Sequence, residues 1–243
     1  MRLMLNETFL FKGKRANGKG IQLREQISLS APEPNFTEQR IPGRNGAIVI
    51  PDGSYKNRTI TAPCYLLSYL LERDIDSINA WLLSDGSYQR FEDTMDQKHF
   101  MMARALMGVE KRAAMGLLNP FILEFDAKPQ RFLKSGEKAV DVTQSKRITN
   151  PTAFPSLPLI EIAGSGDIAI TVNGTPLQIL DLPPNGSITY DAETDTAYSG
   201  AENKNNSIIA QDLITLSPGV NQISVSGGGN VTSIKITPRW WEL

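Results

Sequence analysis

Residues 40–60 read RIPGRNGAIVIPDGSYKNRTI, with a Pro-Gly pair before a short apolar run and an Asp-Gly pair after it. The glycines of both pairs and Gly46 allow positive φ, so the chain can reverse tightly on either side of residues 47–50. An alternating segment follows the second pair. This order predicts a β-hairpin, with Asp52 and Gly53 as its tight turn.

Length and composition predict two soluble domains. The chain has 243 residues, more than the ~100–150 of a usual domain, and 40% of them are hydrophobic, enough for a substantial core. Residues 143–158 are polar and contain three prolines, which remove backbone donors and keep the preceding residues extended. We therefore expect a connector there, between an N-terminal domain, residues 1–149, and a C-terminal domain, residues 150–243.

The N-terminal domain is expected to mix strands with one or two helices. In residues 74–83, Ile75, Ile78 and Leu82 recur at i, i+3 and i+7, the apolar stripe of an amphipathic helix. The Met, Ala and Leu content of residues 101–118 also favours a helix.

After the connector the pattern is almost purely β. Apolar and polar residues alternate in six short segments, as in strands with one buried face. The segments are residues 159–162, 167–172, 177–180, 187–190, 221–225 and 232–237. Turn signals stand between them at residues 164–166, 173–174, 183–186, 218–219 and 227–229. This spacing predicts two antiparallel sheets packed as a β-sandwich or jelly roll.

Charge divides unevenly between the two parts. Residues 1–150 hold 22 basic and 17 acidic side chains, a net of +5, whereas residues 151–243 hold 3 and 9, a net of −6. The difference favours two separately built domains. The cations of the first part are mixed with acids and form no stripe interleaved with aromatic residues, so we expect no specific nucleic-acid binding.

No targeting or membrane segment is expected. The longest apolar runs fall far short of the ~20 residues that span a bilayer, and the N-terminus lacks the cleavage site of a signal peptide. Synthesis in a cytoplasm follows. The single cysteine, Cys64, excludes an intrachain disulfide and is expected to be a small buried residue.

Catalytic and cofactor signals are weak. Residues 13–20, GKRANGKG, fit G-x-x-x-x-G-K but end in Gly where a phosphate-binding loop needs Ser or Thr, so we expect a basic hairpin tip. His99 is the only histidine, which excludes a multi-histidine metal site; we expect it at the surface or a strand end. Acidic pairs such as Glu92 and Asp93 are common among 26 acids. We expect no enzyme activity, metal or cofactor.

Two tryptophans are adjacent near the C-terminus, Trp240 and Trp241. Neighbouring residues on a strand face opposite sides, so one indole is expected in the core and the other outside. An exposed indole would suit contact with a sugar or with a neighbouring protein. The alternative is that both rings close the end of the core.

Several motifs, taken in their order, resemble the distal tail protein (Dit) family of siphophages, the long-tailed, non-contractile phages, also described as the phage tail component (Sipho_tail) family. Residues 40–60 resemble the family's PGR-N-G…DG-Y-KNR signature. Residues 76–86, DSINAWLLSDG, resemble its helix ending in Trp-Leu and a Gly turn. Later matches are residues 91–94, 125–132, 150–162, 216–223 and 238–241.

The resemblance implies a fold, a function and partners. It implies a ring-forming N-terminal domain, with a strand pair in residues 101–118, and a C-terminal jelly roll similar to galectin or carbohydrate-binding modules. It further implies a non-enzymatic virion protein, made in the host bacterial cytoplasm, that forms a ring of six at the distal end of the tail. The implied partners are copies of itself, the tail tube protein and a tail-tip or tail-associated protein, with a receptor-binding protein left open.

The loop of the signature is the candidate assembly interface. Its members are Pro42, Gly43, Arg44, Asn45 and Gly46. The guanidinium of Arg44, on a loop stiffened by Pro and Gly, can form a fork of hydrogen bonds across the fold or across a subunit seam.

A carbohydrate-binding module that contacts the bacterial envelope is the alternative function, with Trp240 or Trp241 as the sugar or partner contact. A wall-degrading enzyme is disfavoured because no active site is recognisable. Other candidate rings are few, because Tyr190 is expected to face inward and only Tyr198 remains. We therefore expect no binding of cell-wall polysaccharide.

Overall fold

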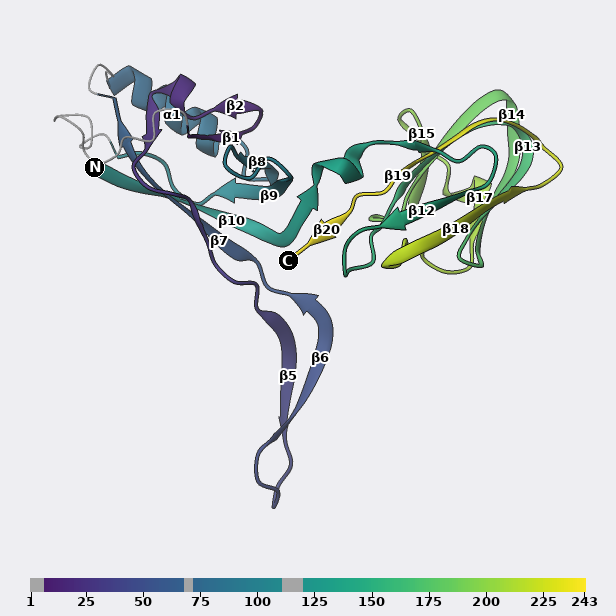
Figure 1. The fold of residues 1–243 in the computed structure, drawn as a ribbon, viewed down its shortest axis with the longest axis horizontal. Helices are drawn as coiled ribbons and strands as arrows, with labels where there is room; N and C mark the ends of the chain where they lie inside the picture. Colours follow the sequence, from purple (N-terminus) through teal and green to yellow (C-terminus); the bar gives the residue numbers. More distant parts are fainter. Residues whose placement is uncertain (1–6, 68–71, 111–119) are drawn as a thin grey trace. The chain divides into compact units, whose positions relative to one another are not determined.

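The protein is mainly β, with one α-helix among the residues that the structure describes (Figure 1). In this computed structural model those are residues 7–67, 72–110 and 120–243. The chain divides into two compact units, the first ending at Arg131 and the second comprising Phe132–Glu242. Each unit has a hydrophobic core of its own.

The first unit is built on one curled sheet. Its strands follow the order β2-β1-β8-β9-β10-β7-β3, and β4 pairs with β7. Their bounds are β1 (Phe9–Phe11), β2 (Lys14–Arg15), β3 (Ile21–Leu23), β4 (Ser28–Leu29), β7 (Arg58–Leu66), β8 (Gln89–Asp93), β9 (His99–Ala105) and β10 (Pro120–Leu133), with a 3-10 turn η1 (Asn17–Lys19) before β3. Burial alternates along β7 and β10, so every second side chain enters the core.

Aromatic side chains form the centre of the first core. Phe9, Phe11, Phe91 and Phe125 are fully buried, and the ring centroids of Phe91 and Phe125 lie 5.0 Å apart. The indole N–H of Trp81 donates to the Phe11 carbonyl at 3.1 Å. This bond satisfies a buried donor and ties the helix to the first strand.

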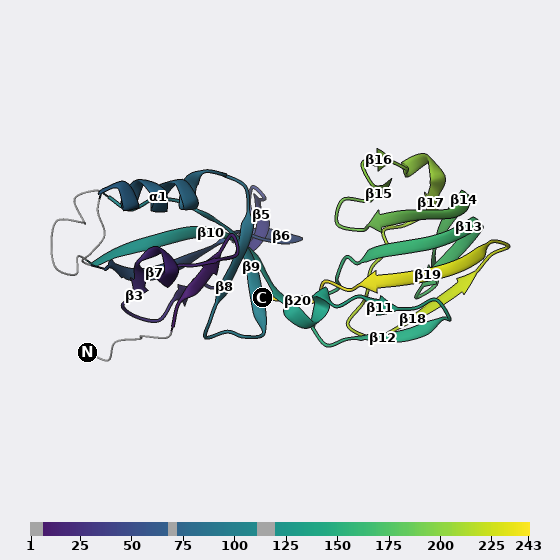
Figure 2. The same ribbon diagram turned by 90° about the horizontal axis from the view of Figure 1, so that it is seen from above.

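The helix α1 (Glu72–Leu83) lies along one face of the sheet (Figure 2). Ile75, Ile78 and Leu82 are all buried in the first core, which confirms the predicted amphipathic stripe. Residues 101–105 belong to β9, as the family resemblance implied and against the helical composition. Residues 111–118 of that ambiguous segment lie outside the described residues.

The predicted hairpin is present, but its turn was misplaced. β5 (Pro34–Arg40) and β6 (Ala47–Tyr55) pair as a separate two-stranded sheet, and the chain reverses at residues 41–46. Asp52 and Gly53 lie within β6, where the register shifts. The Asp52 carboxylate accepts from the Ser54 amide at 2.8 Å, and Gly53 has φ of 80°. The Asp-Gly pair therefore forms a β-bulge, which uses the same residues as a tight turn.

The second unit is also a curled antiparallel sheet. β11 pairs β19, β19 pairs β13, β13 pairs β14, and β14 continues to β15 and β16; β12 joins through β18, and β17 pairs β14. The bounds are β11 (Val140–Asp141), β12 (Lys146–Asn150), β13 (Leu159–Val172), β14 (Thr175–Asp191), β15 (Thr196–Ser199), β16 (Glu202–Asn203), β17 (Ile208–Ala210), β18 (Gly219–Ser226) and β19 (Asn230–Thr237), with 3-10 turns η3 (Lys134–Glu137) and η4 (Asn205–Ser207). The last strand, β20 (Trp241–Glu242), pairs with β10.

Two long bent strands join the layers of the predicted sandwich. The first half of β13 pairs with β19 and its second half with β18. Asn173 and Gly174 form the two-residue turn between β13 and β14, with φ of 51° and 93°, as predicted. Residues 164–166 and 183–186 were predicted as turns but lie inside these strands, where register shifts let the sheet bend.

The division between the units differs from the expected connector. Lys146–Asn150, within the segment predicted to be irregular, forms β12 and pairs with β18. Residues 132–149 therefore belong to the compact second unit. The assignment of residues 1–149 and 150–243 as the two functional domains stays a prediction.

Candidate assembly surface

The hairpin β5–β6, called the arm below, extends away from the sheet of the first unit (Figure 1). Nearly all of its side chains are exposed, and five of them are large and apolar. Their exposed fractions are 50% for Phe36, 41% for Ile41, 36% for Ile48, 55% for Val49 and 49% for Ile50. An isolated two-stranded hairpin is marginally stable in water, and a cluster of exposed apolar side chains marks an interaction site. The arm is therefore the strongest candidate contact surface of this unit.

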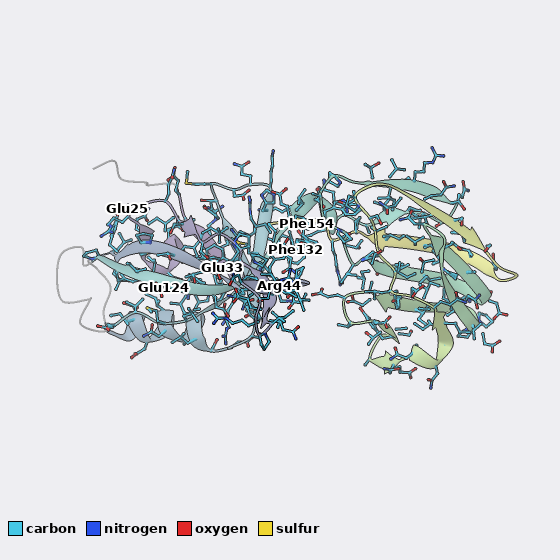
Figure 3. All side chains as sticks on the ribbon, turned by 90° about the horizontal axis from the view of Figure 1, so that it is seen from below. Glu25, Glu33, Arg44, Glu124, Phe132 and Phe154 are labelled. Atoms are coloured by element: carbon cyan, nitrogen blue, oxygen red, sulfur yellow. The ribbon has the colours of Figure 1, made fainter. Side chains whose placement is uncertain are left out.

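The tip of the arm holds the predicted interface loop, residues 42–46, and all five residues are exposed. Gly43 and Gly46 both have φ of 80°, and the Arg44 amide donates to the Ile41 carbonyl at 3.2 Å. Figure 3 looks onto this tip, where Arg44 is labelled. Within the described residues the Arg44 guanidinium forms no hydrogen bond or ion pair. Its predicted fork therefore stays a prediction for a subunit seam.

A buried guanidinium fixes the base of the arm from inside. Arg58 is only 7% exposed; its Nε donates to the Ser30 carbonyl at 3.0 Å and its Nη1 to the Pro129 carbonyl at 3.3 Å. Ser30 and Thr59 are joined by two further hydrogen bonds, of 2.8 and 3.0 Å. Burial lowers the pKa of Arg58, and the nearby charge of Arg131 lowers it further. These hydrogen bonds of Arg58, called the clamp below, tie the segments that lead into and out of the arm to β10.

A polar network holds the same base from outside. The Asp126 carboxylate on β10 accepts from Asn57 Nδ2 at 2.9 Å, from the Tyr88 hydroxyl at 2.7 Å and from Arg104 Nε at 2.9 Å. Burial alone would raise the pKa of Asp126, but these three donors and the charge of Arg104 lower it overall. Asn57 lies between β6 and β7, directly before β7, so the network fixes the place where the arm joins the sheet.

Trp240 and Trp241, the candidate sugar or partner contacts, lie in different surroundings in the second unit. Trp240 is 5% exposed and belongs to the second core. Trp241 is half-buried and stacks on Phe154, with centroids 4.5 Å apart, and its indole N–H donates to the Pro155 carbonyl at 2.9 Å. Phe154 is labelled in Figure 3. The indole of Trp240 is thus in the core, and that of Trp241 contacts Phe154 and Pro155 of the same unit.

The weak catalytic candidates lie in a turn, at the start of a strand and in the core. Lys12 and Gly13, with φ of 51° and 71°, turn the chain between β1 and β2, so residues 13–20 form a hairpin tip and a 3-10 turn before a strand. His99 is the first residue of β9, and its Nδ1 lies 2.8 Å from Asp96 Oδ1. Cys64 is buried, and burial raises the pKa of its thiol to about 12.

Neither a cluster of metal-ligating side chains nor a membrane-spanning helix occurs among the described residues. No group of three or more His, Cys, Asp or Glu side chains there could hold a metal ion. No helix there is long and apolar enough to cross a membrane.

Sequence reasoning missed the residues that hold the arm. Arg58 ends the quoted signature, but its partners lie 28 and 71 residues away along the chain. Tyr88 and Asp126 lie 38 residues apart along the chain. Tyr88 directly precedes β8, whereas Asp126 is in β10. The available signal was an arginine at the start of an alternating apolar strand, which predicts a buried charge.

Comparison with known proteins was informative only at the level of structure. No family model and no curated protein sequence matches the chain. Among solved structures, the crystal structure of the Dit protein (gp 19.1) of phage SPP1 superimposes with a TM-score of 0.68 and 15% sequence identity, over 98% of this chain and 99% of that one. The chain has the fold of a distal tail protein. That Dit protein is described as a paradigm of the hub of the adsorption apparatus in phages infecting Gram-positive bacteria.

The distal tail protein fold accounts for both units, since the match extends over almost the entire length of each chain. It confirms the fold that the ordered motifs implied, a mainly β architecture with one helix among the described residues. At this identity the match establishes the fold.

Proposed function

We propose that this protein is the hub at the distal end of the tail of a long-tailed, non-contractile phage or prophage. In this role it forms a ring of six that joins the tail tube to the tail tip and catalyses no reaction. The observation that carries the proposal is the match of the whole chain, both units included, to the fold of a hub protein. The exposed apolar arm supports it, because a hub needs a permanent contact surface.

The ring contact is assigned to the arm of the first unit. A closed ring requires two different surfaces on each copy, one that reaches out and one that receives. The arm is fixed at its base by Arg58 and Asp126, so it can present its apolar side chains without a large ordering cost. Its tip, residues 42–46, then lies against the next copy, where Arg44 can pair with a carboxylate or carbonyls.

The second unit is assigned the contact with the tail-tip protein, with a receptor-binding protein as a further candidate partner. A role as a carbohydrate-binding module is less well supported. Two clefts of this unit, of about 510 and 310 Å³, are lined without an aromatic side chain. Tyr190 is fully buried, and the face of Trp241 that meets Phe154 is occupied. Saccharide sites usually need an open ring beside converging polar groups.

The location of the protein tests this function. Antibody raised against the purified chain should label assembled phage tails at the end far from the head in electron micrographs. Label along the whole tail shaft would instead indicate a tube protein, and absence of label from intact particles would contradict a virion role. The distal end can be recognised in intact particles, because only the other end of the tail carries the head.

A further inference from the structure

Cross-strand register assigns the side chains of the arm to two faces. Partners directly opposite each other in an antiparallel pair share a face, and successive residues alternate between faces. Ile48 pairs with Gln39 and Ile50 with Thr37. The first face of the arm therefore carries two isoleucines beside two uncharged polar side chains.

The second face is also apolar. Val49 pairs with Glu38, and Phe36 pairs with Pro51. Val49 and Phe36 are each at least half exposed. Arg40 and Ala47 form the next pair on this face, which therefore carries four apolar residues beside one carboxylate and one guanidinium.

An arm that lay on a single partner would need only one apolar face. Antiparallel sheets with one solvated face alternate apolar and polar residues, whereas residues 47–51 form an unbroken apolar run. Within the described residues no second layer covers either face, because nearly all side chains of β5 and β6 are exposed. The apolar run of β6 thus resembles a strand buried on both faces, whereas its partner β5 contributes mainly polar side chains.

We propose that both faces of the arm are buried in the assembled ring, each against another copy of this chain. This inference rests on the proposed function and goes beyond it by stating that the arm is held between two surfaces. It predicts that the two faces contribute separately to assembly and that neither is left in water.

Other copies of this chain are favoured as the occupants because the first unit itself carries exposed apolar side chains away from the arm. Leu106, Met107 and Ile122 are all largely exposed. The Leu106 amide donates to the Glu124 carbonyl at 2.9 Å, which places Leu106 beside β10, two residues from Ile122. A ring brings such a receiving patch of one copy within reach of the arm of the next.

Lysine substitutions test the two faces independently in the full chain. Ile50→Lys alters the first face and Val49→Lys the second. The matched controls are Ile209→Lys and Val220→Lys, because these exposed strand residues of the second unit have the same side chains. Sedimentation of each purified variant then gives the concentration at which half of the chains are in rings.

Both arm variants should raise that concentration by at least about tenfold, equivalent to about 1.4 kcal/mol, whereas the controls should assemble like the wild type. Melting temperatures of the dissociated chains should be unchanged, since the side chains are exposed there. An effect of only one face would overturn this inference and leave the proposed ring contact standing. No effect of either face would overturn the assignment of the ring contact to the arm as well.

Thiol labelling gives a second readout that does not depend on assembly energy. Val49→Cys and Ile50→Cys place single reactive thiols on the two faces, because the native Cys64 is buried. In rings of the purified protein, both positions should react with a maleimide at least about tenfold more slowly than in dissociated chains. A position that stays fully reactive in purified rings, or is protected only in complete tails, would overturn the proposal that a copy of this chain covers it.

Discussion

At the scale of single residues, the arm depends on one arginine that stabilises its attachment. Arg58 donates to carbonyls of Ser30 and Pro129, which come from distant parts of the first unit. Arg58→Met keeps the aliphatic volume but leaves both carbonyls without this donor, so the free energy of unfolding should fall by about 1–3 kcal/mol. Urea denaturation measures this difference. Arg15→Met, on an exposed strand residue, should change stability by less than about 0.5 kcal/mol; equal losses in both variants would contradict the clamp.

Arg44 represents the opposite case, a guanidinium with no intramolecular partner among the described residues. Arg44→Ala should therefore leave the melting temperature of the dissociated chain unchanged. Ring assembly should weaken by about 1–3 kcal/mol per contact if the guanidinium forms its fork across the seam. Sedimentation of Arg44→Ala beside Arg15→Ala separates this effect from a general loss of charge. Unchanged assembly would remove Arg44 from the interface.

At the scale of elements, the Asp126 network joins the end of the arm to β9 and β10, and it makes this junction sensitive to pH. The folded pKa of Asp126 lies below its usual value. Its contribution to stability is therefore present above the unfolded pKa of about 3.9 and is lost as the pH falls through the lower folded pKa. The stability difference between wild type and Asp126→Asn should be largest near neutral pH and disappear in strong acid.

Urea denaturation at a series of pH values tests this dependence. Asp212→Asn is the control, because Asp212 is an exposed carboxylate of the second unit. Its difference from the wild type gives the effect of replacing an exposed carboxylate by an amide at each pH. A pH-independent difference for Asp126→Asn would show that the network contributes no favourable charge interaction.

Local periodicity predicted the elements whose patterns are local. Ile75, Ile78 and Leu82 lie on one face only if the segment is helical, so their spacing alone predicted the helix that buries them. Asp52 and Gly53 were misread because an Asp-Gly pair suits a tight turn and a bulge equally well, and only the pairing partner decides. The polar strand β12 was missed because its neighbour, β18, lies about 70 residues further along the chain.

At the scale of the whole molecule, the order of the motifs along the chain indicated the fold better than any single motif did. Ordered weak motifs indicated the distal tail fold, and the structural match confirms it at 15% identity. The contact surface was only partly predictable. The loop at residues 42–46 was named from the signature, whereas the apolar faces and the clamp depend on register and on distant partners.

The carbohydrate-binding alternative makes a distinct prediction for the whole protein. Calorimetric titration of the full chain with purified cell-wall polysaccharide should show no saturable heat, because Tyr190 is buried and Trp241 already stacks on Phe154 with one face. A saturable isotherm that disappears in Trp241→Ala would make sugar binding the primary function.

Ring formation is the central claim, and the mass of the purified full chain in solution tests it most directly. Light scattering coupled to size exclusion should give six times the mass of one chain, and electron micrographs of the same peak should show closed rings. The mass should fall to that of one chain when the arm is disrupted at Val49 and Ile50 together. A wild-type chain that stays monomeric at every concentration up to its solubility limit would contradict the account.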